Sequence, residues 1–448
     1  MSIAWKQVSP TRWQRPLTGI EDFLLATGNA PVELYNGRQQ YNIFSKLKVE
    51  INVPDVESAL RHAWKQLRYE QPAIAATVDG ERKVYETPDE AGLQQWLSST
   101  FIVSDVSDAD SLLSTPIRQA TLYYLPKISE LILRAHHYVI DGMGTVMFWH
   151  CLMEALVSPN KDLTFGNEYV RLSAPLDEAL GYTGPPTAKQ TQDASAMLTT
   201  YAQSLPSIGL VSAIGKAPAT DCHNTEHTFS RETTGSIIAA CKEKQISVTS
   251  AIQAAWVLML VKHADPSSNR SRYTTANEYN LRPYLPSPHN APTSAVGVYY
   301  APIPFTIELP APYMEIAQAL NSNYQSTLKD NPETVNLTGH YCHLVAAMAK
   351  SPEFKAAPVS TDGLVSSLGV IEKYLRREYG GDAVKVKDFM LGLDVVLGMS
   401  AFFMYTFYDQ LRLVYSFNDG YESPEKVRHY LEDVERILCE ELLGLRSS

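Results

Sequence analysis

The hydrophobic pattern in the first part of the chain alternates between a period of two residues and a period near 3.6. Period-two stretches predict strands, and stretches with apolar residues three and four apart predict helices. Gly and Pro clusters mark the ends of these stretches. The predicted strands are 41–51, 117–124 and 129–137, with a hairpin at 73–85, and the predicted helices start near residues 53, 92 and 144.

The pattern fades between about residues 174 and 221, where Pro, Gly, Thr, Ala and Gln replace large apolar residues. This texture predicts a crossover linker. A similar order of elements then restarts and ends in a helix that begins at Ser423-Pro424. The predicted strands of this part are 225–229, 273–282, 298–307 and 364–371, with three more between 384 and 418, and its helices are 231–244, 248–263, 314–328 and 424–443.

The repeated order of elements predicts an α+β protein with two domains of similar build. We assign residues 1–185 to the first domain, 186–224 to the linker and 225–448 to the second domain. The length of 448 residues agrees with this, since a domain typically takes about 150 residues. Ligand sites often form where two such domains meet, so we expect the site at their interface.

Composition narrows the class of protein. Apolar residues make up 45% of the chain, and the net charge is −11, which argues against a nucleic-acid binder. The five cysteines show no C-x-x-C spacing and suggest neither a metal site nor a disulfide framework. Residues 245–261 are apolar but include polar positions, so a buried helix explains them better than a membrane span. With no apolar signal segment at the N-terminus, we expect a cytoplasmic monomer with no membrane partner.

The strongest candidate for chemistry is the stretch from Arg134 to Gly144, in which an apolar strand ends at His136-His137 and leads through Asp141-Gly142 into a helix. A bare H-x-x-x-D is weak evidence, and a second match at His429 and Asp433 lies in the middle of a polar helix. Requiring the second histidine and the glycine lowers the chance expectation to about one in a thousand. Residues at such a strand end often point into a site.

A histidine at this place is suited to general-base chemistry, because its pKa needs little adjustment near neutral pH. Asp141 would orient His137 or hold the loop, and Gly142 would leave an N–H free for a developing oxyanion. The alternative is a pair of core histidines bonded to backbone carbonyls. A metal site is disfavoured because neither His150 nor Glu154 is spaced to supply a third ligand.

These residues resemble a known family. The stretch H-H-x-x-x-D-G resembles the HxxxD acyltransferase superfamily, which includes chloramphenicol acetyltransferase, the plant BAHD enzymes and the condensation domains of peptide synthetases. The similarity extends to Tyr279–Pro286, Val365–Gly369 and Tyr415–Gly420, and it is closest to the fungal trichothecene O-acetyltransferase type. The resemblance implies two similar chloramphenicol-acetyltransferase-like domains, each a mixed sheet with flanking helices, around an active-site tunnel.

The resemblance also implies roles for individual residues. His137 would be the general base and His136 a supporting residue, while Asp141 would turn away from the channel to pair with Arg282. The region of Gly142 would help to position the tetrahedral intermediate. Burial of an unpaired Asp would be costly, which agrees with a cation supplied by the second half. The alternative for Arg282 is an exposed charge at the rim of the site.

The chain departs from the plant members at one point. Their D-F-G-W-G is replaced by Asp388-Phe-Met-Leu-Gly392, which lies in an apolar run. We therefore interpret this segment as a core strand and transfer no role to Asp388.

The resemblance also points to residues that would bind the donor. The resemblance implies an acyl-CoA co-substrate, no tightly bound cofactor and no metal, with the donor channel beside the strand at 365–369. The candidates for this site are Ser366, Ser367, Gly369, Arg376 and Arg377, and the alternative for the arginines is a solvated hairpin tip because acidic residues are interleaved with them. The aromatic stretch 299–305 is a candidate lining for the acceptor.

We therefore predict an acyltransferase that moves an acyl group, most simply acetyl, from a CoA thioester to a hydroxyl or amine of a small secondary metabolite. One alternative is a free-standing condensation-type enzyme that uses carrier-protein thioesters. Another is a cyclase or isomerase on the same fold, with His137 abstracting a proton. A catalytically dead binding module is disfavoured because His137, Asp141, Gly142 and Arg282 occur together.

Overall fold

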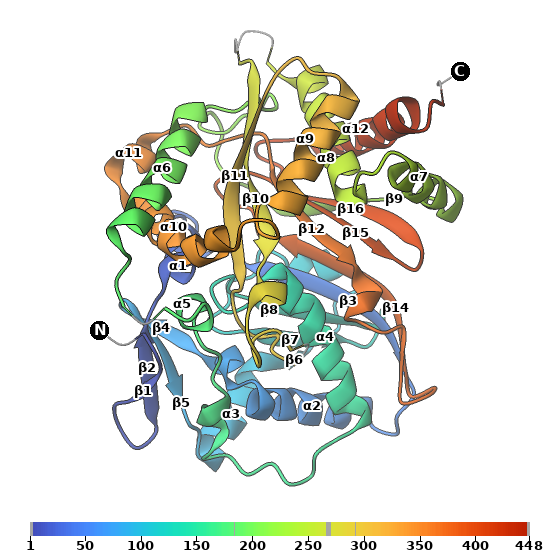
Figure 1. The fold of residues 1–448 in the computed structure, drawn as a ribbon. Helices are drawn as coiled ribbons and strands as arrows, with labels where there is room; N and C mark the ends of the chain where they lie inside the picture. Colours follow the sequence, from blue (N-terminus) through green and yellow to red (C-terminus); the bar gives the residue numbers. More distant parts are fainter. Residues whose placement is uncertain (1–2, 183, 266–269, 292, 446–448) are drawn as a thin grey trace.

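The computed structural model describes residues 3–182, 184–265, 270–291 and 293–445, and Figure 1 shows helices surrounding several sheets. The helices are α1 Gly19–Asn29, α2 Val56–Glu70, α3 Glu90–Thr100, α4 Gly142–Val157, α5 Leu176–Ala179, α6 Ala188–Ser204, α7 Arg231–Glu243, α8 Val248–His263, α9 Tyr313–Ser326, α10 Pro332–Lys350, α11 Pro352–Ala356 and α12 Pro424–Ile437. The strands are β1 Lys6–Gln7, β2 Arg12–Pro16, β3 Ile43–Ile51, β4 Thr77–Asp79, β5 Arg82–Glu86, β6 Phe101–Val103, β7 Thr121–Leu125, β8 Glu130–Ala135, β9 Cys222–Thr228, β10 Arg272–Asn280, β11 Tyr300–Glu308, β12 Leu364–Val370, β13 Glu378–Tyr379, β14 Val384–Leu393, β15 Ala401–Phe407 and β16 Gln410–Asn418.

The larger sheet lies in the lower part of Figure 1 and has the strand order β13-β14-β3-β8-β7-β6. Helices α2 and α4 pack against each other, and α4 also contacts β3 and β14. Strand β3 is central, since Ile43 is opposite Ala135 of β8 on one side and Leu393 of β14 on the other. Strand β14 therefore belongs to this sheet, although its residues come from the second half of the chain.

The second sheet has the order β12-β15-β16-β9 and is covered by α8 and α12. Its core includes Trp256 of α8, which is fully buried and stacks on Phe402 with ring centroids 4.3 Å apart. A mixed sheet with flanking helices thus occurs in each half, which confirms the predicted α+β architecture. The exact domain boundaries remain a prediction, to which the structure adds that β13 and β14 cross to the first sheet.

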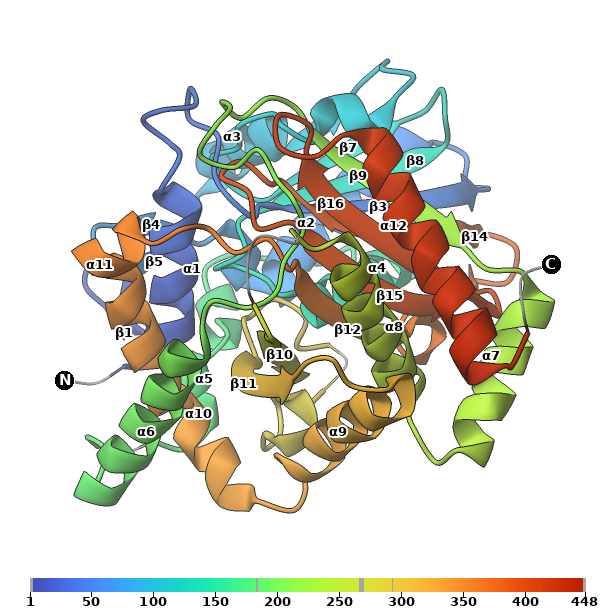
Figure 2. The same cartoon turned by 90° about the horizontal axis from the view of Figure 1, so that it is seen from above.

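Strands β10 and β11 form a separate two-stranded antiparallel ribbon. Its register runs from Arg272 opposite Glu308 to Asn280 opposite Tyr300. In both Figure 1 and Figure 2 the ribbon stands between α6 and α10 on one side and α8 and α9 on the other. The two faces of the ribbon therefore meet different helices.

Two predictions about the middle of the chain were incomplete. The predicted linker 186–224 contains the helix α6, which starts with a capping box between Thr187 and Gln190. Helix α10 was not predicted at all. Its buried face includes Thr338 and Gly339, which do not read as apolar positions, so the helical period is weak in the sequence.

Among the described residues, no single helix is both long and apolar enough to cross a membrane. The pair α7 and α8 meets the length and composition criteria together, but the two helices are bent by 103° with respect to each other. Helix α8 covers most of the apolar stretch 245–261, and most of its residues are buried in the protein core.

A buried ion triad supports the strand end that carries the two histidines. Glu21 accepts hydrogen bonds from Arg15 at 2.6 and 2.7 Å and from Lys83 at 2.8 Å. Lys83 also donates to the backbone oxygen of Tyr138, at 2.9 Å. Burial alone would raise the pKa of Glu21, but Arg15 and Lys83 outweigh this effect and hold it well below its ordinary value. The carboxylate therefore fixes a lysine that contacts the residue after His137.

Replacement of Glu21 by Ala should destabilise the protein by about 3–5 kcal/mol, because it leaves two buried cations without their anion. The measurement is the free energy of unfolding from denaturant titration. Glu57→Ala is the control, since Glu57 pairs with Arg61 at the surface and its loss should change the stability far less. Equal effects of the two substitutions would contradict the structural role of the triad.

Candidate functional site

The two histidines directly follow β8 and have different surroundings. His136 is buried, its Nδ1 lies 3.0 Å from Oδ1 of Asn42, and its ring stacks on Tyr138. Burial lowers the pKa of His136 to about 4. His136 is therefore held in place by neighbours, which agrees with its predicted supporting position.

His137 is half-buried, and its ring stacks on Tyr300 of β11 with the centroids 6.0 Å apart and the planes at 15°. Its Nδ1 is buried and has no hydrogen-bond partner within the described part of the chain. Burial lowers the pKa of His137 to about 4, although the Asp141 carboxylate acts in the opposite direction. The imidazole is therefore neutral at pH 7 and has an electron pair available to accept a proton.

Asp141 is the N-cap of α4 and is buried. Its Oδ1 accepts from the N–H of Gly144 at 2.6 Å, and its Oδ2 accepts from the N–H of Tyr299 at 2.7 Å. Arg282 Nη1 lies 2.9 Å from both carboxylate oxygens. The predicted pair of Asp141 and Arg282 is thus present, and two backbone bonds that the sequence did not indicate reinforce it.

The close approach of α4 to Arg282 and to the backbone of Ala295 requires a glycine at position 144. A Cβ on this residue would lie 2.3 Å from the backbone oxygen of Ala295 and 3.0 Å from Nη2 of Arg282. Arg282 itself is 4% exposed, so the alternative of a rim charge is wrong. Its guanidinium also lies over the ring of Tyr299, 5.2 Å from the centroid.

Gly142 is the first residue of α4, two residues before the predicted helix start, because the Asp141 side chain caps the helix. The N–H groups of a first helical turn have no partner within the helix and attract negative charge. A Cβ on Gly142 would meet the side chains of Leu368 at 3.2 Å and Leu391 at 3.3 Å. Strand β12, which carries Leu368, therefore lies next to the histidine loop.

The predicted donor-site residues lie on and after β12. Ser366 and Ser367 belong to the strand, and Gly369 follows an irregularity in its register with a φ of 66°. Ser367 Oγ lies 2.8 Å from Oγ1 of Thr249 at the start of α8. These small residues are thus near Leu368, which brings them close to Gly142.

The two arginines are farther away and already paired. Arg376 forms an ion pair with Glu154 and lies over Tyr379, and Arg377 pairs with Glu372 at 2.7 Å. Glu154 is twelve residues after Gly142 on α4, which corresponds to about 18 Å along the helix. Arg376 is therefore well separated from His137, and a role in holding the distant phosphates of a donor remains a prediction.

Two stretches to which we assigned no catalytic role from the sequence lie on the strand β14 and the helix α12. The segment Asp388–Gly392 is part of β14, and Phe389 to Leu393 are buried, which confirms the core strand. His429 of the second H-x-x-x-D match is exposed on α12, and its Asp433 binds Lys262 at 2.7 Å and His263 at 2.6 Å. This second match therefore has the geometry of a surface ion cluster.

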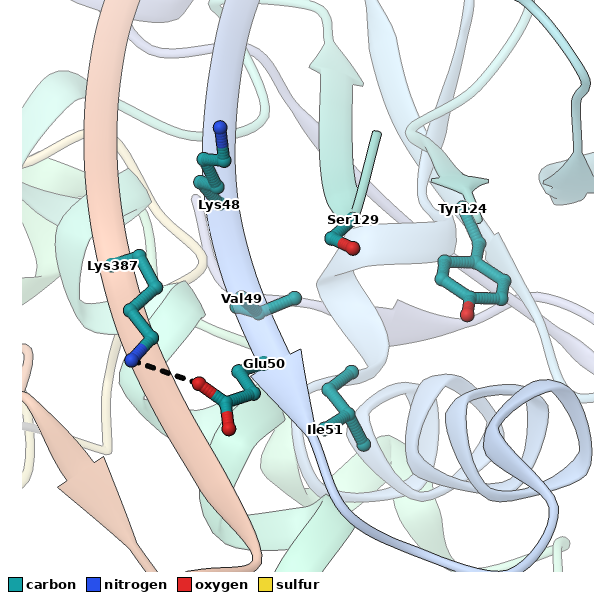
Figure 3. Close-up of a pocket in the computed structure, with 7 residues that line it drawn as sticks. All are labelled: Lys48, Val49, Glu50, Ile51, Tyr124, Ser129 and Lys387. Atoms are coloured by element: carbon teal, nitrogen blue, oxygen red, sulfur yellow. Dashed lines mark ion pairs between the residues drawn. The ribbon is translucent and has the colours of Figure 1, made fainter. Parts of the chain in front are cut away.

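A surface pocket lies at the other end of β3 and is separate from the histidines (Figure 3). Ile43 of β3 is opposite Ala135, whereas Glu50, which lines the pocket, is seven residues farther along. This separation is about 23 Å at the usual rise of a strand. Figure 3 shows Lys387 turned toward Glu50, with which it forms an ion pair of 2.8 Å.

Sequence reasoning missed three contacts of the site: Asn42 at His136, the N–H of Tyr299 at Asp141, and the ring of Tyr300 at His137. The aromatic stretch 299–305 was identified only as a possible channel lining. The described residues contain no group of three or more His, Cys, Asp or Glu side chains that is arranged to hold a metal ion.

Comparisons with known proteins give the context of this site. No protein-family model matches the chain. The chain is 26% identical to "Acetyltransferase pigO" of Monascus ruber over 99% of both chains, and 26% identical to "O-acetyltransferase pigM" of the same organism over 98% of this chain and 87% of that one. It is also 26% identical to "Loline biosynthesis cluster 1 transcription factor lolU1" of Epichloe uncinata, over 99% of this chain and 97% of that one.

Solved structures with the same fold include the trichothecene 15-O-acetyltransferase TRI3 of Fusarium sporotrichioides, with a TM-score of 0.80, 16% identity and 96% of both chains covered. The first condensation domain of the calcium-dependent antibiotic synthetase has a TM-score of 0.63 at 13% identity, with 96% of this chain and 97% of that one covered. These findings confirm the predicted resemblance to the HxxxD acyltransferase superfamily, its fold and the enzyme class, an acyltransferase.

Replacement of Asp141 by Asn should destabilise the protein by about 3–5 kcal/mol, because Arg282 would remain buried without its counter-charge. The free energy of unfolding measures this effect. Asp433→Asn is the matched control, since it alters the other H-x-x-x-D match but removes only a surface ion cluster, and we expect it to cost clearly less. A loss for Asp141→Asn that does not exceed that of the control would contradict the assigned role.

Proposed function

We propose that this chain transfers an acyl group from a CoA thioester to a hydroxyl or amine of a small secondary metabolite, with His137 as general base. The observation that carries the proposal is a neutral, half-buried His137 on a loop that the Asp141–Arg282 pair fixes. The acetyltransferase names of two relatives support acetyl as the group, and the name of pigM supports a hydroxyl acceptor. The biosynthesis cluster in a third name supports a secondary metabolite.

The proposed reaction needs no covalent intermediate on the enzyme. His137 accepts the proton of the acceptor hydroxyl while the oxygen attacks the thioester carbonyl. Because Nδ1 is enclosed, we assign this role to Nε2. The tetrahedral oxyanion then collapses and the carbon–sulfur bond breaks. The departing thiolate takes the proton from the His137 imidazolium, which releases the ester and the free thiol and restores the neutral base.

The other residues would position these groups. The N–H groups of Gly142 and Met143 in the first turn of α4 would favour the developing negative charge, since those of Gly144 and Thr145 are bonded to Asp141. Asp141 and Arg282 would act through the loop, since both are engaged with each other and with backbone. Ser366, Ser367 and Gly369 would border the donor near Gly142, and Arg376 and Arg377 would lie farther out toward its phosphates.

A second candidate function is condensation with a carrier-protein thioester. The similarity in fold to a condensation domain favours it. The chemistry at His137 would be the same, since either donor presents a thioester on a phosphopantetheine arm. The two candidates differ only in what holds the far end of that arm.

One relative is named a transcription factor, but the properties of this chain argue against DNA binding. A net charge of −11 is unfavourable for binding the phosphates of DNA, whose neutralisation needs basic residues. The arginines proposed for the donor are already paired with carboxylates. A general base inside the protein also has no use in sequence-specific binding.

His137→Ala should lower acyl transfer by about 10²- to 10⁴-fold, the usual contribution of a general base. The measurement is mass spectrometry of products from acetyl-CoA, longer acyl-CoA and acyl carrier-protein thioesters with a panel of alcohols and amines. His429→Ala, which alters the exposed histidine of the second match, is the control and should keep full activity. Near-normal turnover of folded His137→Ala would contradict the assignment, and turnover only with carrier thioesters would favour the second candidate.

The rate should stay constant from pH 8 down to about pH 5 with an uncharged alcohol as acceptor. His137 has a pKa lowered to about 4, so it is neutral above that value and loses its function only as the pH falls through it. The measurement is kcat/KM against pH. A decline by half near pH 6.5, the ordinary value for His, would show that the catalytic base is not in the environment described.

A further inference from the structure

Glu278 lies near the C-terminal end of β10 and is on the His137 face of the ribbon. It is opposite Pro302, and the neighbouring pair on the same face is Asn280 and Tyr300. Side chains two residues apart on a strand share a face, so Glu278 and Tyr300 lie on the same side and within diagonal reach. Tyr300 stacks on His137, so the ring of Tyr300 lies between the Glu278 carboxyl and the proposed base.

The Glu278 carboxyl lacks a partner. Its Oε2 is buried and makes no hydrogen bond to any residue that the structure describes. Burial raises the pKa of Glu278 to about 8. The buried carboxylates Glu21 and Asp141, by contrast, are each bonded to cations. An unsatisfied buried carboxyl costs free energy, so its presence requires an explanation.

Two tyrosines of neighbouring helices lie near this carboxyl. Helices α6 and α10 pack against β11 on the same side of the ribbon, as Figure 2 shows. Tyr201 of α6 and Tyr341 of α10 are close enough for the charge of Glu278 to act on their hydroxyl groups. Glu278, Tyr300 and Tyr201 are half-buried, so each keeps some surface that a small molecule could reach.

We propose that Glu278 binds a positively charged amine group of the acceptor, with the rings of Tyr201 and Tyr300 beside it. An ammonium group would supply the hydrogen bonds and the counter-charge that the carboxylate lacks. Tyrosine rings attract cations through their faces, which adds to the same preference. The inference names the substrate class and so rests on the proposed function, but the binding step is tested without any acyl transfer.

The pH dependence of this binding follows from the groups that face Glu278. These groups are Tyr300 from β11, Tyr201 from α6, and Tyr341 and Cys342 from α10. Tyr324 from α9 bonds to Asn277 on the opposite face of the ribbon but is still within range of the charge of Glu278. Burial raises the pKa of all five. All five stay neutral between pH 6 and 9. His137, with its pKa of about 4, is neutral over the same range. None of these groups changes its charge in this range, so a pH dependence of cation binding would come from Glu278. A bound cation would lower the pKa of Glu278 and release its proton.

The experiment uses the purified full chain without thioester and a matched series of probes: benzamidinium, which carries N–H donors and stays charged up to pH 9, benzyl alcohol and benzoate. Isothermal titration calorimetry should detect binding of the cation only, with an affinity about 30-fold higher at pH 9 than at pH 6.5, since the ionised fraction of a group with a pKa of about 8 rises from about 3% to about 91%. Titrations at pH 7 in buffers of different ionisation enthalpy should show close to one proton released for each bound cation.

Glu278→Gln should weaken binding of the cation at pH 9 and remove both the pH dependence and the proton release. Glu422→Gln is the matched control, because Glu422 is another buried carboxyl with a raised pKa, about 7, but is hydrogen-bonded to Ser400 and Tyr415 elsewhere in the fold. It should leave all three observations unchanged. Circular dichroism establishes that each variant is folded.

Binding of benzyl alcohol as strong as that of the cation, or a pH dependence that persists in folded Glu278→Gln, would overturn the inference. If the variant does not fold, the probe series with the wild-type chain still decides. Cation binding without acyl transfer to any acceptor would overturn the proposed function and keep the binding site. Acyl transfer to uncharged acceptors without cation binding would keep the proposed function and overturn the cation site at Glu278.

Discussion

The site depends on one buried carboxylate, that of Asp141. It accepts bonds from the guanidinium of Arg282 and from the N–H groups of Gly144 and Tyr299, so it joins the start of α4 to the segment between β10 and β11. A single side chain thereby fixes the helix that begins beside His137 and connects it to a distant part of the chain. Because the pair is buried, its value lies less in net stability than in specifying one arrangement of the two segments.

Burial affects the charged groups of this region in opposite ways. It removes the positive form of His137, which makes the imidazole a free base at neutral pH. It would also raise the pKa of Glu21, but Arg15 and Lys83 within bonding distance keep this carboxylate ionised. Oε2 of Glu278 has no such partner in the part of the chain that the structure describes. This region thus contains paired charges that hold the loop and, near the proposed base, a carboxyl of Glu278 whose Oε2 is not satisfied by any described residue.

Local patterns predicted much of the fold, and contacts between distant residues account for what was missed. The apolar run of α8 predicted the helix 248–263 without error, since this signal lies within the helix itself. The partner of Asp141 was reached only through the resemblance to a family, and the bond from the N–H of Tyr299 has no sequence signal. Glu278 reads in the sequence as an ordinary polar residue of an alternating strand, and only the register of β10 with β11 reveals its neighbours.

Strand β14 has a consequence for the way the protein is made. The central strand β3 emerges early in synthesis, but its neighbour on one side is β14, more than 330 residues later. Until residue 393 is available, β3 has an open edge with unpaired N–H and C=O groups, and such edges recruit strands of other chains. A fragment that ends at the linker would therefore be a poor expression target, and the nascent chain needs protection until most of its length has been synthesised.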